Sequence, residues 1–474
     1  MTTTSVEPKS NQEQSTRTTL ELYQQVVPVA FIEGLPLEKK QQRGKQGIFT
    51  LSVVLWLMIF QRLHPKGTLW VAVQRVICGL PAELIRKPSK RVREGTVSSH
   101  TGGYNQARQK LPLSVVEQVS DQVFQQLSAA KTPAGAKVEP RWFLLDGSTL
   151  LMPRTPSLEK AYPPGCNQHG ESHWPILRVL VAHDLRSGIA LRPQWGSVNG
   201  SEAVSEQSLS ETLLKYVPEG AGVLGDRNFG VFSVAWDARQ KNHPVLLRLT
   251  EGRSKRAFGL VSNSGTDRRV EWRPSRWDRD SHPELPRDAL MGGRLIIRKV
   301  YPSDGSSPFK LYLFTTSELD ADEVVRIYGL RWNVETDLRA LKKTIRLEML
   351  ECRTSEMVAK ELILAVVAYN LVRTVIEESA QQTHLEPRQY SFSKVQDVLN
   401  IWLPHISSLP SEAERQAAYQ QMMRCVAQCK LYKRKGNKSY PRAVWHRPCP
   451  FPRRTTASSK HTIPPSPASM AERS

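Results

Sequence analysis

Two short apolar segments, each carrying one aspartate, constrain the fold of this chain more than any other feature. The segment RWFLLDGSTLLMP is typical of a buried strand of apolar and β-branched residues, interrupted by Asp146. The segment GAGVLGDRNFG predicts a second short strand that ends at Asp226, followed by a turn. An acid inside a buried strand is costly unless it is paired or metal-bound. An acid at the carboxyl end of a strand lies where open α/β sheets place their functional sites.

A third segment, YGLRWNVETDLRALK, places polar side chains at helical spacing. On one α-helix, four of them fall within an arc of roughly 60°, and these are Tyr328, Arg331, Glu335 and Lys342, with Arg339 beside them. A carboxylate in such a stripe could hold a divalent cation while the cations grip phosphates on either side. Mixed charges at helical spacing are also typical of a solvated helix face. The two aspartates upstream favour the metal-binding interpretation.

The charge of the chain favours a polyanionic partner. Its 474 residues include 66 lysines and arginines against 45 aspartates and glutamates, a formal net charge of +21. Counterion release from phosphates gives such a protein generic affinity for DNA or RNA. The longest apolar run, residues 49–60, is too short to span a bilayer. The polar N-terminus lacks an apolar signal region, so we expect a protein that stays in the cytoplasm.

The pattern along the chain predicts an α/β fold with helical regions at both ends. Strand, hairpin, helix, strand and helix follow one another in the middle, a mixed order rather than repeated βαβ units. The predicted segments are a disordered start at 1–20, a helical DNA-binding domain at 21–135, an α/β core at 140–249 and 300–350, a β-strand insertion at 250–299, C-terminal helices at 351–429, and a basic, partly disordered tail at 430–474.

Two regions outside the core are candidates for DNA contact. The segment SSHTGGYNQARQKL is similar to a helix-turn-helix that offers Tyr104, Gln106 and Arg108 to a groove. An ordinary surface helix after a solvated loop explains the same segment equally well. The stretch from Lys430 to Arg454 carries nine lysines or arginines and no acid. It predicts flexible contact with phosphates, although basic tails also serve only to keep proteins in solution.

These residues resemble the signature of the bacterial DDE transposases of the insertion-sequence-four type. The pattern Tyr-x2-Arg-x3-Glu-x6-Lys is present as Tyr328, Arg331, Glu335 and Lys342. The words DGSTLLMP and DRNF match around the two aspartates. The similarity extends over about residues 95–400, and more weakly to the basic end, with SYPR at 439–442. Two acid contexts together with a signature at fixed spacing are far more specific than any single motif.

The resemblance implies a fold, a site and a chemistry. The fold is a ribonuclease H-like mixed sheet flanked by helices, with Asp146 on its first strand, Asp226 after its fourth and Glu335 on a later helix. A β-rich insertion lies between the second and third acids. The three acids are expected to hold two Mg²⁺ ions, which Mn²⁺ can replace. The implied reaction cleaves DNA at terminal inverted repeats and joins the 3′-OH ends to target DNA.

The same resemblance implies the partners and the residues that hold them. The partners are double-stranded DNA, as element ends and as target, and further copies of the chain, in a homodimer or higher assembly on DNA. The expected place in the cell is the bacterial cytoplasm, in association with the nucleoid. The residues expected to contact DNA phosphates near the acids are Arg227, Tyr328, Arg331, Arg339 and Lys342. Arg227 has a plainer alternative, which is to pair with a structural acid.

Two other functions stay open at this point. One is a repressor of the element, derived from a transposase that binds DNA and no longer cuts it. The presence of all three acids disfavours this alternative. The other is a metal-dependent nuclease that hydrolyses DNA without joining strands. Sequence does not separate it from a transposase, because hydrolysis and strand joining use the same metal site.

Overall fold

The computed structural model describes residues 27–35, 47–64, 66–78, 84, 89–129, 141–167, 170–259, 263–301, 307–348 and 350–431. The predicted disordered start at 1–20 and the basic tail beyond Leu431 lie outside these residues. Apart from Tyr301 and Ser307, the described residues belong to one compact unit. Within them, no helix is both long and apolar enough to cross a membrane.

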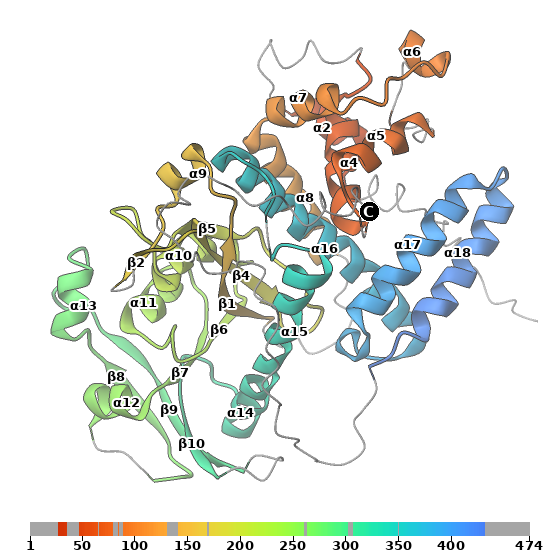
Figure 1. Cartoon of the computed structure of the whole chain (residues 1–474). Coiled ribbons are helices and arrows are strands. Elements are labelled where there is room, and N and C mark those ends of the chain that lie inside the picture. Colours follow the sequence, from red (N-terminus) through yellow and green to blue (C-terminus); the bar gives the residue numbers. More distant parts are fainter. Residues whose placement is uncertain are drawn as a thin grey trace, which may run out of the picture. The chain divides into compact units, whose positions relative to one another are not determined.

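A mixed eight-stranded sheet carries the fold (Figure 1). Its strands lie in the order β5-β4-β1-β6-β7-β10-β9-β8, and a two-stranded sheet joins β2 to β3. β1 and β7 each run parallel to β6, whereas the remaining pairs are antiparallel. The bounds are β1 Trp142–Leu151, β2 Cys166–Asn167, β3 Gly170–Glu171, β4 Ile176–Asp184, β5 Gln194–Ser197, β6 Gly222–Gly225, β7 Val245–Leu249, β8 Asp267–Trp272, β9 Met291–Val300 and β10 Phe309–Thr315.

Helices cover both faces of this sheet. The α-helices of the described residues are α2 Val29–Gly34, α4 Leu51–Leu63, α5 Leu69–Ile77, α6 Lys90–Arg93, α7 Gly102–Lys110, α8 Leu113–Ala129, α9 Pro156–Ala161, α10 Glu206–Leu213, α11 Phe232–Gln240, α12 Glu251–Phe258, α13 Arg276–Ser281, α14 Ala321–Gly329, α15 Asn333–Arg339, α16 Ser355–Thr383, α17 Phe392–Ser408 and α18 Glu412–Ala427. A mixed sheet flanked by helices confirms the ribonuclease H-like class implied by the resemblance.

The alternation of side chains along β1 assigns the two faces. Phe143 and Leu145 pack with residues of α10 and α11. Leu144 packs on the other face, with Ile327 and Tyr328 of α14. Successive side chains of a strand point to opposite faces, so each strand residue has a determined direction. β1 is therefore buried on both sides at its start, as its continuous apolar run predicts.

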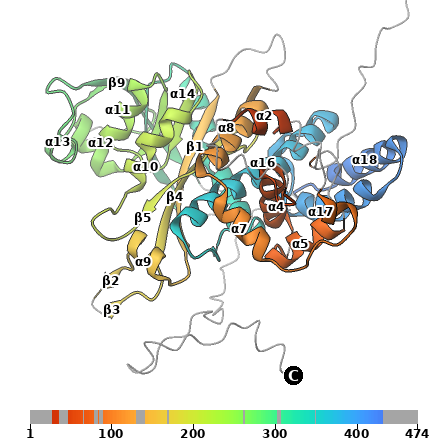
Figure 2. The same cartoon turned by 90° about the horizontal axis from the view of Figure 1, so that it is seen from above.

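Helix α16 joins the N-terminal helices to the rest of the fold. Its residues Ile363 and Leu364 share a hydrophobic cluster with α4, α5 and α8. Its residues Leu362 and Val366 belong instead to the cluster that includes α17 and α18. Figure 2 shows α4 beside α16 and α17, and the amide of Gln396 on α17 donates to the carbonyl of Leu63 on α4 at 2.8 Å. The predicted N-terminal and C-terminal helical segments thus pack onto one shared helix.

The insertion predicted at 250–299 extends the main sheet. β8 and β9 pair with each other and continue the sheet through β10. The short helices α12 and α13 accompany them. Trp272 is buried against Phe258 and Phe314, whereas Trp277 is 65% exposed. The insertion is therefore β-rich as predicted, with one tryptophan in its core and one at its surface.

The signature segment is not the single α-helix that its spacing predicts. α14 gives way to a 3₁₀ turn at Leu330–Trp332, and α15 ends in a π-helical stretch at Ala340–Thr344. A π-turn widens the helix and shifts the residues that follow around its axis. The shift brings Leu341 and Ile345 into the hydrophobic cluster that contains α16. The departure from a straight stripe thus coincides with the burial of these two side chains.

Candidate active site

Asp146 lies in the middle of β1 and on the face covered by α14. It follows Leu144 by two residues, so the alternation of the strand directs both side chains to the same face. One carboxylate oxygen of Asp146 accepts a hydrogen bond from the backbone N–H of Gly147 at 2.9 Å. Ser148, two residues further, points to this face as well. The first predicted acid is therefore built into the sheet rather than carried by a loop.

Asp226 lies level with Asp146 on the neighbouring strand. β1 and β6 are parallel, and Leu144 pairs with Leu224. Each aspartate follows its leucine by two residues, and neighbouring strands are about 4.8 Å apart. Asp226 begins the turn after β6, where its carboxylate accepts the backbone N–H of Asn228 at 2.7 Å. The register of two parallel strands thus places the two acids side by side.

The electrostatics of Asp146 reflect this arrangement. Burial, helped by the negative charges of Asp226 and Glu206, raises its pKa to about 7. The hydrogen bond from Gly147 and the positive charge of Arg331 act in the opposite direction. The carboxyl group therefore holds its proton to a much higher pH than an ordinary aspartate does. A cation placed between the two aspartates would relieve this accumulation of negative charge.

Three residues of the Tyr-Arg-Glu-Lys signature surround the aspartates. Tyr328 is buried at the end of α14, and burial raises the pKa of its hydroxyl despite the nearby charges of Arg331 and Arg248. The Nζ of Lys342 donates a hydrogen bond to the Oγ of Ser148 at 3.0 Å. The guanidinium of Arg331 lies 5.4 Å from the centre of the Trp332 ring. These side chains bring two positive charges and a phenol to the neighbourhood of the two aspartates.

Glu335 occupies a different position. It lies on α15, which packs beside β1, and its side chain is exposed. Across the described ranges, no three histidine, cysteine, aspartate or glutamate side chains converge closely enough to hold a metal ion. Arg227 and Arg339 are exposed too. The structure thus joins Asp146 to Asp226 and leaves Glu335 outside a converged metal-binding group.

Comparison with known proteins bears on this site. Residues 138–371 match the family model described as a transposase DDE domain. The chain carries a DDE transposase domain. It is also 24% identical over 362 residues to transposase InsG for insertion sequence element IS4 of Escherichia coli strain K12, and the match covers 73% of this chain and 74% of InsG. The family range contains both strand aspartates and the whole signature, which confirms the resemblance seen in the sequence. As a DDE transposase, the protein acts on DNA and depends on divalent metal ions.

The transposase holds α15 in place through a buried ionic network that sequence reasoning missed. Asp337, two residues after Glu335, is fully buried. Its carboxylate accepts hydrogen bonds from Arg388 at 2.6 Å, from the hydroxyl of Tyr369 at 3.0 Å, and from Arg373. Burial acts against its charge, but the two guanidiniums hold the pKa of Asp337 well below its ordinary value. The network orients Glu335 outward because Asp337 occupies the inner face of the helix.

Nothing in the sequence singles out Glu206, the first residue of α10. The sequence predicts a helix with a serine cap there, and Ser205 does cap α10. In the structure of the transposase, Glu206 lies close enough to Asp146 to raise its pKa, and its carboxylate accepts a hydrogen bond from Asn228, two residues after Asp226. No spacing motif connects it with either acid, so only the fold reveals the proximity.

The predicted DNA-contact face of α7 is wrong for two of its three residues. Tyr104 is fully buried and donates its hydroxyl hydrogen to Gln61 at 2.6 Å. Arg108 is 8% exposed and forms an ion pair with Glu361 of α16. Residues four apart share one face of a helix, and this face of α7 packs on the core. Gln106 is exposed on another face and stays available to DNA.

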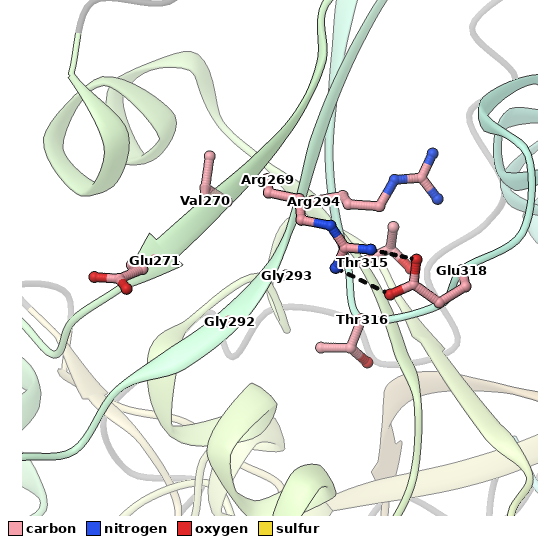
Figure 3. A pocket seen from close by; sticks show the side chains of 9 residues that line it. All are labelled: Arg269, Val270, Glu271, Gly292, Gly293, Arg294, Thr315, Thr316 and Glu318. Atoms are coloured by element: carbon pink, nitrogen blue, oxygen red, sulfur yellow. Dashed lines mark hydrogen bonds and ion pairs between the residues drawn. The ribbon is translucent and has the colours of Figure 1, made fainter.

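A hollow in the insertion lies away from the aspartates. It is lined by residues of β8, β9 and the end of β10, and Figure 3 shows Arg269 paired across it with Glu318, at 2.8 and 3.1 Å. β10 runs antiparallel to β7, which is parallel to β6. The C-terminal end of β10 thus lies at the N-terminal ends of β6 and β7, whereas Asp226 follows the C-terminal end of β6. This hollow is separate from the acid pair of the transposase.

Proposed function

We propose that the protein binds the terminal inverted repeats of its own insertion element, cuts DNA strands there and joins the 3′-OH ends to target DNA. The observation that carries the proposal is the level placement of Asp146 and Asp226 on neighbouring parallel strands, with Lys342 and Arg331 beside them. The similarity to InsG, a transposase for an insertion sequence element, supports an element end as the substrate.

The donor set suits a hard divalent cation. Carboxylates and water are the ligands that Mg²⁺ prefers in proteins, and a buried aspartate with a raised pKa gains from an adjacent positive charge. We assign Asp146, Asp226 and Glu335 as the ligands of two Mg²⁺ ions, with Mn²⁺ as a substitute. When bound, the ions would activate the attacking oxygen and stabilise the departing 3′ oxygen. The assignment of Glu335 requires its exposed side chain to join the aspartates when metal and DNA bind.

The basic side chains near the acids have a distinct role in this proposal. Arg331 and Lys342 lie beside Asp146 and offset charge on the phosphate that is cut. Tyr328 positions the same group from the end of α14. The exposed Arg227 and Arg339 hold flanking phosphates and set the register of the DNA. A dimer or higher assembly brings two element ends together.

Substitution of the three acids tests the proposal. Asp146→Ala, Asp226→Ala and Glu335→Gln should each abolish Mg²⁺-dependent cleavage of labelled element ends, because each removes one ligand. Binding to the same ends in a gel-shift assay should persist. Asp288→Ala, at an exposed aspartate of the insertion, is the matched control and should cut normally.

Each outcome of this assay has a clear meaning. Substantial cleavage by one of the purified single variants would remove that residue from the site. Wild-type protein that binds ends and never cuts them would be a repressor. Wild-type protein that cuts and yields no joined product would be a nuclease.

A further inference from the structure

The side chain of Glu206 reaches both β1, which carries Asp146, and the turn after β6, which begins at Asp226. One of its carboxylate oxygens accepts a hydrogen bond from the side-chain amide of Asn228 at 2.5 Å. The same carboxyl group occupies the space that a Cβ atom would take at Gly147. Asn228 is two residues after Asp226, and Gly147 follows Asp146 directly. One side chain therefore spans the distance between the two acidic positions.

Both the backbone and the side chain of Asn228 are hydrogen-bonded in this arrangement. Its backbone N–H donates to the carboxylate of Asp226 at 2.7 Å. Its side-chain and backbone oxygens accept hydrogen bonds from the amide of Gln207, at 2.9 and 2.8 Å. Its side-chain amide donates to Glu206, as described above. A capping box of Ser205 and Ser208 fixes the start of α10, which carries both partners.

The absence of a side chain at Gly147 is a condition for this approach. Any larger residue there would collide with the Glu206 carboxyl group, which is the flexible end of a side chain. Glu206 would then have to move away, and its hydrogen bond to Asn228 in the turn after β6 would be lost. The sequence DGS around Asp146 thus accommodates a residue that lies about sixty positions further along the chain.

We propose that Glu206 is a positioning residue of the active site, which fixes the Asp226 turn against β1 through Asn228. The inference rests on the proposed function insofar as the two aspartates bind metal. Groups that hydrogen-bond around metal ligands set their orientation, and removing one typically lowers metal affinity or activity about 10- to 100-fold. Because Glu206 and Gln207 both form hydrogen bonds with Asn228, the turn keeps the Asp226 carboxylate beside Asp146 in the metal-free protein.

Two substitutions of Glu206 separate its hydrogen bond from its charge. Glu206→Ala removes the acceptor for Asn228, and we expect cleavage at saturating DNA to slow about 10- to 100-fold. The Mn²⁺ concentration for half-maximal cleavage should rise, and the dissociation constant for DNA should stay unchanged. Glu206→Gln keeps an acceptor oxygen and should restore most of the rate. Glu211→Ala, an exposed glutamate on the same helix, is the matched control.

A measurement that needs no catalysis accompanies the kinetics. Amide hydrogen exchange over residues 222–231 should become faster in Glu206→Ala than in wild type, because the turn loses a partner. The exchange should return toward the wild-type rate in Glu206→Gln. If wild-type protein cuts no DNA, the proposed function fails, and the exchange data still decide the role of Glu206.

Three results would overturn the inference. The first is an unchanged cleavage rate and metal requirement in Glu206→Ala. The second is a Glu206→Gln variant as slow as Glu206→Ala, which would assign the effect to charge. The third is unchanged exchange over residues 222–231. Should Glu206→Ala fold poorly, Gln207→Ala removes two of the bonds to Asn228 and should show the same effects at smaller size.

Discussion

Asp146 occupies a strand whose start is buried on both faces, and its carboxyl group lies beside a second carboxylate. Burial and the neighbouring acids raise its pKa to about 7, while an unfolded aspartate titrates at 3.8. The folded protein therefore binds a proton more tightly than the unfolded chain does at this position. By linkage, the stability contributed here decreases as the pH rises from 3.8 to about 7, and the destabilisation is complete above that range.

This linkage gives a prediction for Asp146→Asn. In metal-free protein at about pH 8 the variant should unfold at a higher temperature than wild type, because a neutral amide avoids the buried charge. The difference should shrink as the pH falls toward the pKa of an unfolded aspartate. Calorimetry in the presence of a chelator measures it. Adding Mn²⁺ should stabilise wild type and leave the variant nearly unchanged.

The matched control for this prediction is Asp288→Asn, at an exposed aspartate outside the site. Its melting temperature should follow that of wild type across the pH range. Equal melting temperatures of wild type and Asp146→Asn at alkaline pH would show that Asp146 is not under electrostatic strain.

At the scale of elements, helix α15 presents two acids on opposite faces. Glu335 points outward, while Asp337 is held by Arg373 of α16 and by Arg388. The guanidinium of Arg388 also donates to the carbonyl of Asp184 at 2.8 Å, at the end of β4. One buried carboxylate therefore fastens the helix to α16, to the segment after it and to the sheet.

Asp337→Asn should destabilise the protein by about 3–5 kcal/mol, the usual loss when one partner of a buried ion pair is removed. The two arginines keep their charges in a buried site without the opposing carboxylate. Urea unfolding measures the change in free energy. Glu335→Gln, two residues away on the exposed face, should leave stability unchanged while it abolishes cleavage. A small effect of Asp337→Asn would mean that the arginines find water or another acceptor.

Elements with a local pattern of residues are predictable from the sequence, whereas features that depend on distant residues are not. The apolar runs around Asp146 and Asp226 predict their strands correctly, because continuous burial leaves a local pattern of residues. The π-helical stretch after α15 escapes prediction, because Leu341 and Ile345 pack in a cluster with residues of α16 that lie further along the chain. Arg108 illustrates the same difficulty. Its partner Glu361 is 253 residues further along the chain, so a basic residue in a polar helix resembles a DNA-binding one.

The residues of the site fall into the same two groups, those that a local sequence pattern predicts and those that only the fold brings together. Strand positions predict Asp146 and Asp226 where the structure has them, because both lie within local patterns. Asp337 and Glu206 act through partners brought close by the fold alone. The arginines that hold Asp337 are 36 and 51 residues away, and no spacing rule connects them.

At the scale of the whole molecule, the net charge of +21 predicts a strong dependence of DNA binding on salt. A chain that ends after Leu431 lacks most of the basic stretch. It should bind DNA more weakly than the full chain does. The slope of the logarithm of its binding constant against the logarithm of the salt concentration should also be shallower, by about 0.9 for each phosphate that it no longer neutralises. Fluorescence anisotropy over a salt series measures both quantities.

Two controls define this last prediction. A full-length chain with glutamines in place of the basic residues beyond Leu431 should match the shortened chain, because only charge is changed. An unchanged salt slope in the shortened chain would show that the segment binds no phosphate.

The anchoring of Asp337 by Arg388 has a consequence for how the protein is made. A ribosome that has translated Asp146, Asp226 and Glu335 has not yet produced the arginines that lock α15 against the sheet. Polypeptides terminated between these points contain every proposed ligand, yet they lack the clamp that orients the last one. We therefore expect a fragment that ends at a premature stop codon in this interval to leave α15 without a fixed position and to cut no DNA.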